Sequence, residues 1–297
     1  MAGQTLSEIR ALLAGRGLSP RHRFGQNFLI DLNLMRKLVH AAALTADDVV
    51  LEVGPGTGSL TELLLEAGPR VVAVEIDRGL AGILTDRFAD RPRFTLLNCD
   101  VLAGKNEIAP NLIAALEDAR ARSENSSGSA AALKLVANLP YQVATPLLLE
   151  LLCRTPRFDL LAFTIQKEVA DRLTAETGTA DYGPISVIVR IASTVELLAD
   201  VAPAAFWPRP KVESAMMIMR PIRNPPIDDL IGFAALVRRA FLHRRQMLRR
   251  IVARWQNAKA AITALEESGI DSAARPQDIC PDAWRRWHQS LRAAERT

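Results

Sequence analysis

The sequence contains little cysteine. Its three cysteines, Cys99, Cys153 and Cys280, lie far apart in a chain of 297 residues and form no CxxC pair. An odd number of widely spaced cysteines argues against a disulfide framework and a cysteine-bound metal site, and is typical of proteins in a reducing compartment. We therefore expect a cytoplasmic protein without a bound metal.

Long apolar runs and phosphate-binding P-loops are also absent. No apolar stretch approaches the roughly 20 residues that span a bilayer. The N-terminal "MAGQTLSEIRALLAG" lacks the basic start and apolar core of a secretory signal, and is predicted to form a short amphipathic helix. The pattern GxxxxGK[ST] does not occur. These absences argue against membrane insertion, secretion and P-loop hydrolysis of a nucleotide.

Charge is distributed unevenly along the chain. The composition, 49% hydrophobic and 24% charged, is that of a globular protein, and the formal net charge is +4. Residues 201–297 carry 17 Lys and Arg against nine Asp and Glu, whereas residues 1–200 carry 20 against 24. A basic tail on a slightly acidic body indicates either an anionic macromolecular partner or a solvated helix surface.

Apolar, β-branched runs alternate with amphipathic stretches over the first two thirds of the chain. The candidate strands are residues 48–53, 70–76, 93–100, 133–139, 160–166 and 214–221. Such strands separated by helices of about 10–15 residues indicate βαβ units and a parallel sheet with helices on both faces. We predict an α/β fold with a mostly parallel, doubly wound, Rossmann-like sheet and a small C-terminal all-α domain.

Two shifts in composition interrupt this order. Residues 123–131 are rich in Ser, Gly and Ala and are predicted to form a mobile surface loop. The proline-rich segment 201–215 favours an extended connection over a helix. From about residue 228 onward the pattern is helical. A boundary near residue 222 therefore predicts two domains, at residues 1–222 and 223–297.

Glycines and carboxylates follow successive strands. Gly54, Gly56 and Gly58 stand between a strand and a helix, where glycine lets the backbone approach a ligand closely. Glu75 and Asp100 end the next two strands, where carboxylates can accept from ribose hydroxyls and from an adenine amine. Taken singly, these residues also fit a structural turn, a surface carboxylate or a helix cap. Together they indicate an adenosine-containing ligand at the carboxyl edge of the sheet.

The segment Asn138-Leu139-Pro140-Tyr141 follows the fourth strand. The Asn138 carboxamide oxygen and a backbone carbonyl held by the rigid Leu139-Pro140 step are two acceptors, which suit an exocyclic amine with two N–H donors. Tyr141 offers a face on which a base can stack. A proline turn with a packed tyrosine is the alternative. Beside an adenosine site, the pattern favours transfer of a group to an aromatic amine.

Seven motifs together resemble those of one known family. They are "FGQNFL" (24–29), "LEVGPGTGSLT" (51–61), "VEID" (74–77), "NCDVL" (98–102), "NLPY" (138–141), "QKEVADRL" (166–173) and "FWPRPKVESA" (206–215). Over nearly its whole length the chain resembles the small-subunit ribosomal RNA adenine N6,N6-dimethyltransferases, which use S-adenosyl-L-methionine. The resemblance implies a class I methyltransferase sheet, dimethylation of two adjacent adenosines near the 3′ end of 16S rRNA, and the small ribosomal subunit as partner. We expect a monomer.

The same resemblance implies roles for individual residues. Those implied at the cofactor are Gln26, Asn27, Leu29, Gly54, Gly56, Glu75, Asp100 and Asn138. Those implied at the target adenine are Asn138, Leu139, Pro140 and Tyr141, with Phe206 as the second aromatic wall. On another interpretation, residues 24–29 are only a loop leading into a helix capped by Asp31.

Residues 235–255 are predicted to form one basic helix. At about 100° per residue, residues 237, 241, 248, 251, 252 and 255 share an apolar stripe. Arg238, Arg245 and Arg249 cluster on one flank, which suits RNA phosphates or simply solvent, whereas Arg244 falls inside the stripe. The family's basic element carries one more positive charge than this chain has at residues 244–248, so weaker RNA affinity or salt dependence is expected.

Two other functions remain compatible with the sequence. The erythromycin-resistance methylases share the chemistry but act on large-subunit rRNA, and a ribosome-assembly factor could keep the fold and the RNA contact without turnover. The long 206–215 element and the basic tail favour the small-subunit enzymes. Intact residues at every cofactor and target position argue against a decayed site.

Overall fold

The computed structural model describes residues 4–21, 24–104, 107–123, 131–154 and 156–294. The chain divides into two compact units, of which the first holds Met1–Leu151, Thr155–Glu168 and Glu196–Arg220. The second holds Leu152–Arg154, Val169–Val195 and Pro221–Thr297. Its last segment begins beside the boundary expected at residue 222. The division differs from the expected one because Val169–Val195 belongs to the same unit as the C-terminal helices.

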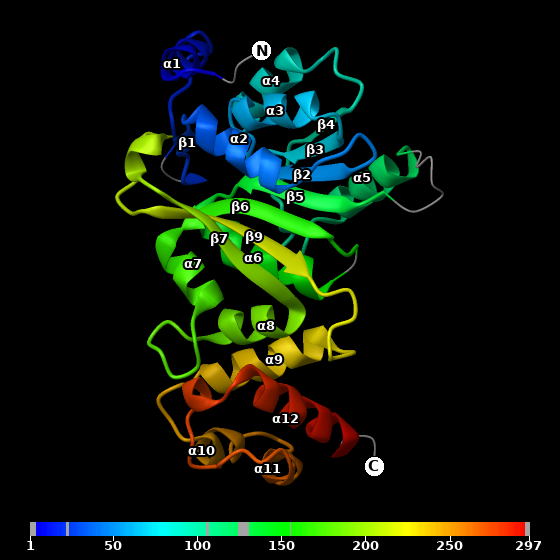
Figure 1. Ribbon diagram of the computed structural model, residues 1–297, viewed down its shortest axis with the longest axis vertical. Coiled ribbons are helices and arrows are strands. Elements are labelled where there is room, and N and C mark those ends of the chain that lie inside the picture. Colours follow the sequence, from blue (N-terminus) through cyan, green and yellow to red (C-terminus); the bar gives the residue numbers. More distant parts are fainter. Residues whose placement is uncertain (1–3, 22–23, 105–106, 124–130, 155, 295–297) are drawn as a thin grey trace. The chain divides into compact units, whose positions relative to one another are not determined.

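The first unit is built on a sheet with seven strands in the described residues, in the order β4-β3-β2-β5-β6-β9-β7 (Figure 1). The strands are β2 (Val49–Val53), β3 (Arg70–Val74), β4 (Phe94–Leu97), β5 (Leu133–Asn138), β6 (Leu160–Gln166), β7 (Ser193–Val201) and β9 (Ser214–Pro221). The five neighbouring strands β4, β3, β2, β5 and β6 all pair in parallel. Strand β9 pairs antiparallel with β6. The predicted α/β fold with a mostly parallel sheet is confirmed. Strand β7 was not expected.

Helices cover both faces of this sheet. They are α2 (Leu32–Ala41), α3 (Ser59–Glu66), α4 (Arg78–Arg87), α5 (Pro110–Ala121) and α6 (Tyr141–Cys153). Helix α1 (Leu6–Ala14) instead packs through Ile9 and Leu13 on Leu80 and Ile83 of α4. Val50, Val71 and Val136 pack in one cluster with α2 and α3. The neighbouring Leu51 and Leu135 point to the other face because side chains alternate along a strand, and both are fully buried. Burial of each such side chain contributes about 1.5–3 kcal/mol.

A second, two-stranded sheet joins distant parts of the chain. Strand β1 (Phe28–Leu29) pairs antiparallel with β8 (Phe206–Trp207), which follows the short 3-10 helix η2 (Pro203–Ala205). The rings of Phe28 and Trp207 stack with their centroids 6.1 Å apart. The proline-rich connection thus holds residues 28 and 29 at one end of the main sheet.

The second unit is helical. Its elements are α7 (Lys167–Thr174), α8 (Pro184–Ala192), α9 (Leu230–Phe241), α10 (Leu248–Val252), α11 (Ala258–Glu267), η3 (Pro276–Asp278) and α12 (Pro281–Ala294). Trp284 and Trp287 are fully buried at its centre. Trp284 stacks on Phe241, and Trp287 on Trp255, with both pairs of ring centroids 5.8 Å apart. An aromatic core therefore holds these helices together.

The prediction of one continuous helix over residues 235–255 is wrong. Helix α9 ends at Phe241, and α10 begins at Leu248. The N–H groups of Leu248 and Arg249 donate to the carbonyls of Ala274 and Ser272, at 2.8 and 2.9 Å. Acceptors from a later segment thus replace those that a continuous helix would supply. The six residues of the predicted apolar stripe are nevertheless all buried.

Two other expectations concern the chain as a whole. Most of the predicted loop 123–131 lies outside the described residues, so its expected mobility stays a prediction. In the described part of the chain, no helix combines the length and the apolar character that crossing a bilayer requires.

Candidate active site

A cavity opens where the strands of the first unit end. It has about 190 Å³ of space for water-sized molecules. It is lined by residues that follow β2, β3, β4 and β5 and by the segment before α2. The predicted site residues among its lining are Gln26, Asn27, Leu29, Gly54, Gly56, Glu75, Asp100, Asn138, Leu139, Pro140 and Tyr141. The topology therefore brings together residues that are far apart in the sequence.

The glycines after β2 form a cradle that side chains would fill. Gly54 and Gly56 have φ angles of +69° and +62°. A Cβ atom on Gly56 would lie 2.9 Å from Cε1 of Phe28, and one on Gly54 would lie 3.0 Å from Cγ of Pro140. Glycine is thus required both by backbone conformation and by the close approach of two cavity walls.

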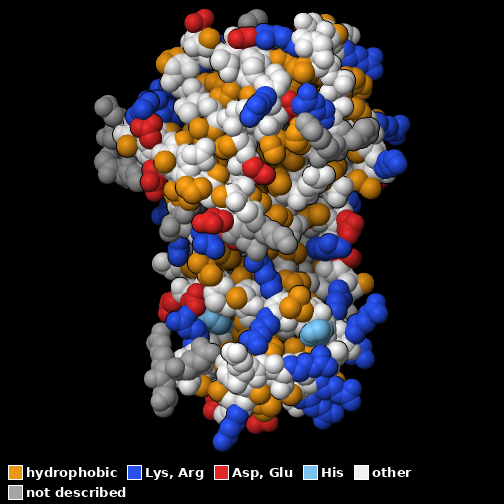
Figure 2. All heavy atoms as spheres, turned by 180° about the vertical axis from the view of Figure 1, so that it is seen from behind, with side chains coloured by type: hydrophobic (Ala, Val, Ile, Leu, Met, Phe, Trp, Pro, Cys, Tyr) orange, Lys and Arg blue, Asp and Glu red, His pale blue; other side chains and the backbone are white. Residues whose placement is uncertain are grey.

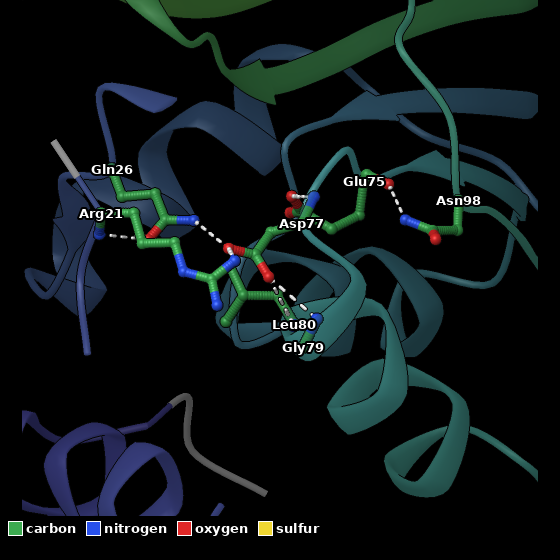
Figure 3. Close-up of polar contacts among 7 residues, drawn as sticks. All are labelled: Arg21, Gln26, Glu75, Asp77, Gly79, Leu80 and Asn98. Carbon is green, nitrogen blue, oxygen red and sulfur yellow. Dashed lines mark hydrogen bonds and ion pairs between the residues drawn. The ribbon is translucent and has the colours of Figure 1, made fainter. Parts of the chain in front are cut away.

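Glu75 is buried at the rim of this cradle, with 4% of its surface exposed. The N–H of Gly56 donates to Oε2 at 3.1 Å, and the N–H of Asp77 donates to Oε1 at 2.9 Å. Asn98 donates to the backbone carbonyl of Glu75 at 2.7 Å (Figure 3). Burial raises the pKa of Glu75 to about 7, although the two N–H groups oppose this shift. The carboxylate is therefore held rigidly beside the cavity.

A second buried carboxylate, Glu52, was missed in the sequence. It lies within β2, is 1% exposed and lines the cavity. The Thr61 hydroxyl donates to its Oε2 at 2.7 Å. Burial raises the pKa of Glu52 to about 8, and the charge of Glu75 raises it further. An acidic residue inside the apolar run "VVLEV" was the available signal.

Asp100 lies three residues beyond the end of β4. Its Oδ1 accepts from the N–H of Leu102 at 3.0 Å, so it does shape a turn. It is also exposed and lines the cavity. The turn and the ligand-binding interpretations are therefore compatible, because a carboxylate that fixes the loop through one oxygen has a second oxygen for a further donor.

Asn138 ends β5 and presents an unpaired acceptor. Its Nδ2 donates to the backbone carbonyl of Asn27 at 3.1 Å. Its Oδ1 is buried and has no hydrogen-bond partner among the residues that the structure describes. A buried polar atom without a partner costs about 1–3 kcal/mol. Such an atom on a cavity wall is satisfied when a ligand donates to it.

Tyr141 begins α6 beside this acceptor. Its hydroxyl shares a hydrogen bond of 2.8 Å with the Ser214 hydroxyl. Burial of the phenol raises its pKa, so the hydroxyl stays protonated at neutral pH. The hydrogen bond fixes the ring at the cavity wall, where it is available for stacking.

Phe206 does not reach the cavity, in contrast to the expected second aromatic wall. It is 3% exposed and is not among the described residues that line the cavity. Pairing of β8 with β1 turns its ring into the apolar cluster that also contains Leu29, Met35 and Leu60. Those three residues do line the cavity, so Phe206 supports the wall from behind.

The four arginines expected to contact RNA lie in the helical unit and differ in exposure. Arg245 and Arg249 are exposed, whereas Arg238 and Arg244 are half-buried. Arg244 donates to the carbonyl of Ala180 at 3.1 Å, which accommodates a charge within the apolar stripe. Lys and Arg side chains gather over part of this unit in Figure 2.

Comparisons with known proteins agree with this geometry. Residues 17–291 match the family model described as ribosomal RNA adenine dimethylase. Two curated relatives are the ribosomal RNA small subunit methyltransferases A of Pediococcus pentosaceus and Magnetococcus marinus. The former is 38% identical, with 92% of this chain and 90% of the relative aligned, and the latter 39%, with 91% of each.

Solved structures share the fold at lower identity. A dimethyladenosine transferase from Plasmodium falciparum has a TM-score of 0.71 at 20% identity and covers 90% of this chain and 98% of its own. The 23S rRNA methyltransferase ErmE has a TM-score of 0.60 at 24% identity and covers 90% of this chain and 100% of its own. These identities show the fold alone. The family match and the curated relatives go further: this chain belongs to the ribosomal RNA adenine dimethylase family.

Proposed function

We propose that this protein uses S-adenosyl-L-methionine to dimethylate adenine N6 on two adjacent adenosines near the 3′ end of 16S rRNA in the small ribosomal subunit. The observation that carries the proposal is the unpaired Oδ1 of Asn138, a buried acceptor on the wall of a cavity that Glu75 also lines. The family match and the names of the curated relatives support the choice of reaction and of subunit.

The residues present fit the proposed cofactor. The Gly54–Gly56 cradle leaves room that any Cβ would fill, Glu75 offers carboxylate oxygens for ribose hydroxyls, and Asp100 offers one for the adenine amine. When bound, S-adenosyl-L-methionine supplies an electrophilic methyl group on its sulfonium. Asn27 and Leu29 would close the cavity above it, since β1 is fixed by β8.

Asn138 and Tyr141 act on the target base. Oδ1 of Asn138 and the backbone carbonyl beside Pro140 accept the two N–H groups of its amine, which keeps the nitrogen lone pair out of the aromatic ring. With S-adenosyl-L-methionine bound, that lone pair would form the new N–C bond as the S–C bond breaks and S-adenosylhomocysteine leaves, and the nitrogen would then lose a proton to solvent. No strong base is needed, because the nitrogen becomes acidic only after it gains the methyl group. Positioning and electrostatics therefore carry the rate.

The first test is transfer of a radiolabelled methyl group to purified, unmethylated small subunits, with large subunits alongside. We expect N6,N6-dimethyladenosine in the small subunit only. Label in the large subunit would assign the chain to the resistance-type chemistry. Cofactor binding without transfer to either subunit would favour the alternative function of a ribosome-assembly factor without turnover.

Asn138→Ala tests the acceptor directly. Loss of one preorganised electrostatic contact in an active site lowers kcat by about 100-fold or more, so methyl transfer should fall by that order. Binding of S-adenosylhomocysteine, measured by calorimetry, should change little because Glu75 and the glycine cradle remain. Asn33→Ala, at an exposed position on α2, is the matched control. Full activity in Asn138→Ala would refute the proposed role.

A further inference from the structure

Asp77 stands two residues after Glu75 and is the N-cap of α4. It is 3% exposed. Its Oδ1 accepts from the N–H of Gly79 at 2.8 Å and of Leu80 at 3.4 Å, as in an ordinary cap. Its backbone N–H donates to Oε1 of Glu75. One oxygen of Asp77 and its N–H are thus assigned to local structure.

The other oxygen of Asp77 binds the N-terminal segment. Oδ2 accepts from Nε2 of Gln26 at 3.2 Å and pairs with the Arg21 guanidinium at 3.0 Å. Oε1 of Gln26 in turn accepts from the N–H of Arg21 at 2.8 Å. Figure 3 shows these three side chains meeting beside Glu75.

These contacts add a structural role to the one expected for Gln26. The sequence implied a residue at the cofactor, and Gln26 does line the cavity, while its carboxamide oxygen and nitrogen each also bind the protein. Its neighbour Asn27 continues the connection, because the Asn27 carbonyl accepts from Nδ2 of Asn138. That bond orients the Asn138 carboxamide and leaves Oδ1 unpaired within the described chain.

We propose that Arg21, Gln26 and Asp77 are positioning residues that link the ribose-binding carboxylate to the methyl-acceptor site. Asp77 holds Glu75 through its N–H and the segment before β1 through its carboxylate, and that segment orients Asn138. The proposal rests on the proposed function and adds residues to its site.

A purely stabilising ion pair is the competing explanation. The Arg21 side chain is 40% exposed but that of Asp77 is 3% exposed, so breaking the pair also costs some stability. The two explanations separate in experiment because loss of positioning impairs cofactor binding and transfer well below Tm, where the protein is still folded.

The experiment is an exchange of hydrogen-bonding groups between Gln26 and Asp77. Gln26→Glu places a carboxylate against Asp77, and we expect it to raise the KM for S-adenosyl-L-methionine and the Kd for S-adenosylhomocysteine by about tenfold or more and to lower kcat. Adding Asp77→Asn restores a donor opposite the introduced carboxylate, so the double variant should recover most of the lost affinity. Small-subunit binding should stay close to that of the unchanged protein, and every assay is run well below the Tm of the variant so that the protein is folded.

Arg16→Gln is the matched control. Arg16 pairs with Asp86, so it too joins the N-terminal segment to α4, but both side chains are about half exposed and neither lines the cavity. We expect normal kinetics from it. Arg21→Gln provides a second variant that leaves the α4 cap untouched, and should weaken cofactor binding in the same direction.

Several results would overturn the inference. They are normal affinity and kcat in Gln26→Glu, a double variant no better than the single one, or a loss of binding seen only at temperatures where the variant begins to unfold. Failure of the proposed function is distinguishable, because binding of S-adenosylhomocysteine is measured without transfer. If the unchanged protein binds S-adenosylhomocysteine but transfers no methyl group, the proposed reaction is wrong. If the affinity then still falls in Gln26→Glu and recovers in the double variant, the link between these residues stands.

Discussion

At the scale of single residues, the site depends on polar groups held in costly environments. Glu52 and Glu75 are buried carboxylates, and Asn138 carries a buried acceptor without a partner in the described chain. Each costs free energy of folding. Glu75 and Asn138 also gain when a ligand donates a hydrogen bond to them, so stability is exchanged for binding. We therefore expect cofactor binding to raise Tm by more than contact area alone suggests.

Glu52 makes stability depend on pH in an unusual direction. Its pKa is about 8 in the folded protein and 4.5 in the reference state. Between these values the folded state holds a proton that the unfolded chain releases. Stability therefore falls as pH rises, by about 1.4 kcal/mol per pH unit for one group. Glu52→Gln removes this titration, so its Tm relative to the unchanged protein should rise from about pH 5 to about pH 8.

Glu75 titrates in both proteins, so only the part of its titration that is coupled to Glu52 enters this comparison. Glu117→Gln, at an exposed position on α5, serves as the control and should show no such trend. Thermal melts at a series of pH values provide the measurement. Parallel curves for Glu52→Gln and the unchanged protein would show that Glu52 is ionised in the folded state.

At the scale of elements, the junction of β2 with α3 depends on its glycines, of which Gly56 is the sharpest test. Gly56→Ala forces a side chain into a left-handed conformation, which costs about 1–2 kcal/mol, and pushes it against Phe28 of β1. We expect lower stability and weaker binding of S-adenosylhomocysteine, seen in denaturant titration and calorimetry. Gly82→Ala within α4 is the opposite control: no described atom outside its helix lies within 4 Å of the added Cβ. It should stabilise by up to about 1 kcal/mol. Equal effects of both substitutions would contradict this account.

Sequence patterns predicted the elements whose signals are local. The candidate strands and the N-cap Asp31 follow from periodicity and capping chemistry, and both are present. The break between α9 and α10 was not predictable, because the apolar stripe keeps its phase across the break and the carbonyls that begin α10 come from residues 272 and 274. Strands β1 and β8 were missed because two residues are too short to show a period.

The difference between local signals and contacts of distant residues also explains which parts of the site could be predicted. Glycines and carboxylates at strand ends could be assigned because topology brings the carboxyl ends of parallel strands together. The position of Phe206 and the engagement of Gln26 depend on the β1–β8 pairing and on Asp77. Both partners lie in motifs, but no local pattern shows which distant residues they contact.

At the scale of the whole molecule, the cavity and the arginines expected to bind RNA belong to different units. The cavity belongs to the first unit, and the exposed Arg245 and Arg249 lie in the second. Arg245→Gln and Arg249→Gln should each weaken small-subunit binding and lower the slope of log affinity against log salt by about 0.7–0.9. Arg285→Gln is the control because that arginine pairs with Asp282 and Gln289. Slopes unchanged in both variants would remove these arginines from the RNA contact.

The pairing of β1 with β8 sets an order on synthesis. Residues 28 and 29 leave the translating ribosome early, but their partners at residues 206 and 207 follow only after more than half of the chain has been added. The glycine cradle, the two carboxyl groups and Asn138 can all be in place before β8 has been synthesised. Until then nothing pairs with residues 28 and 29. A nascent chain therefore cannot finish its cofactor site while it is still short, and partial products of translation should be inactive toward the ribosomes that surround them.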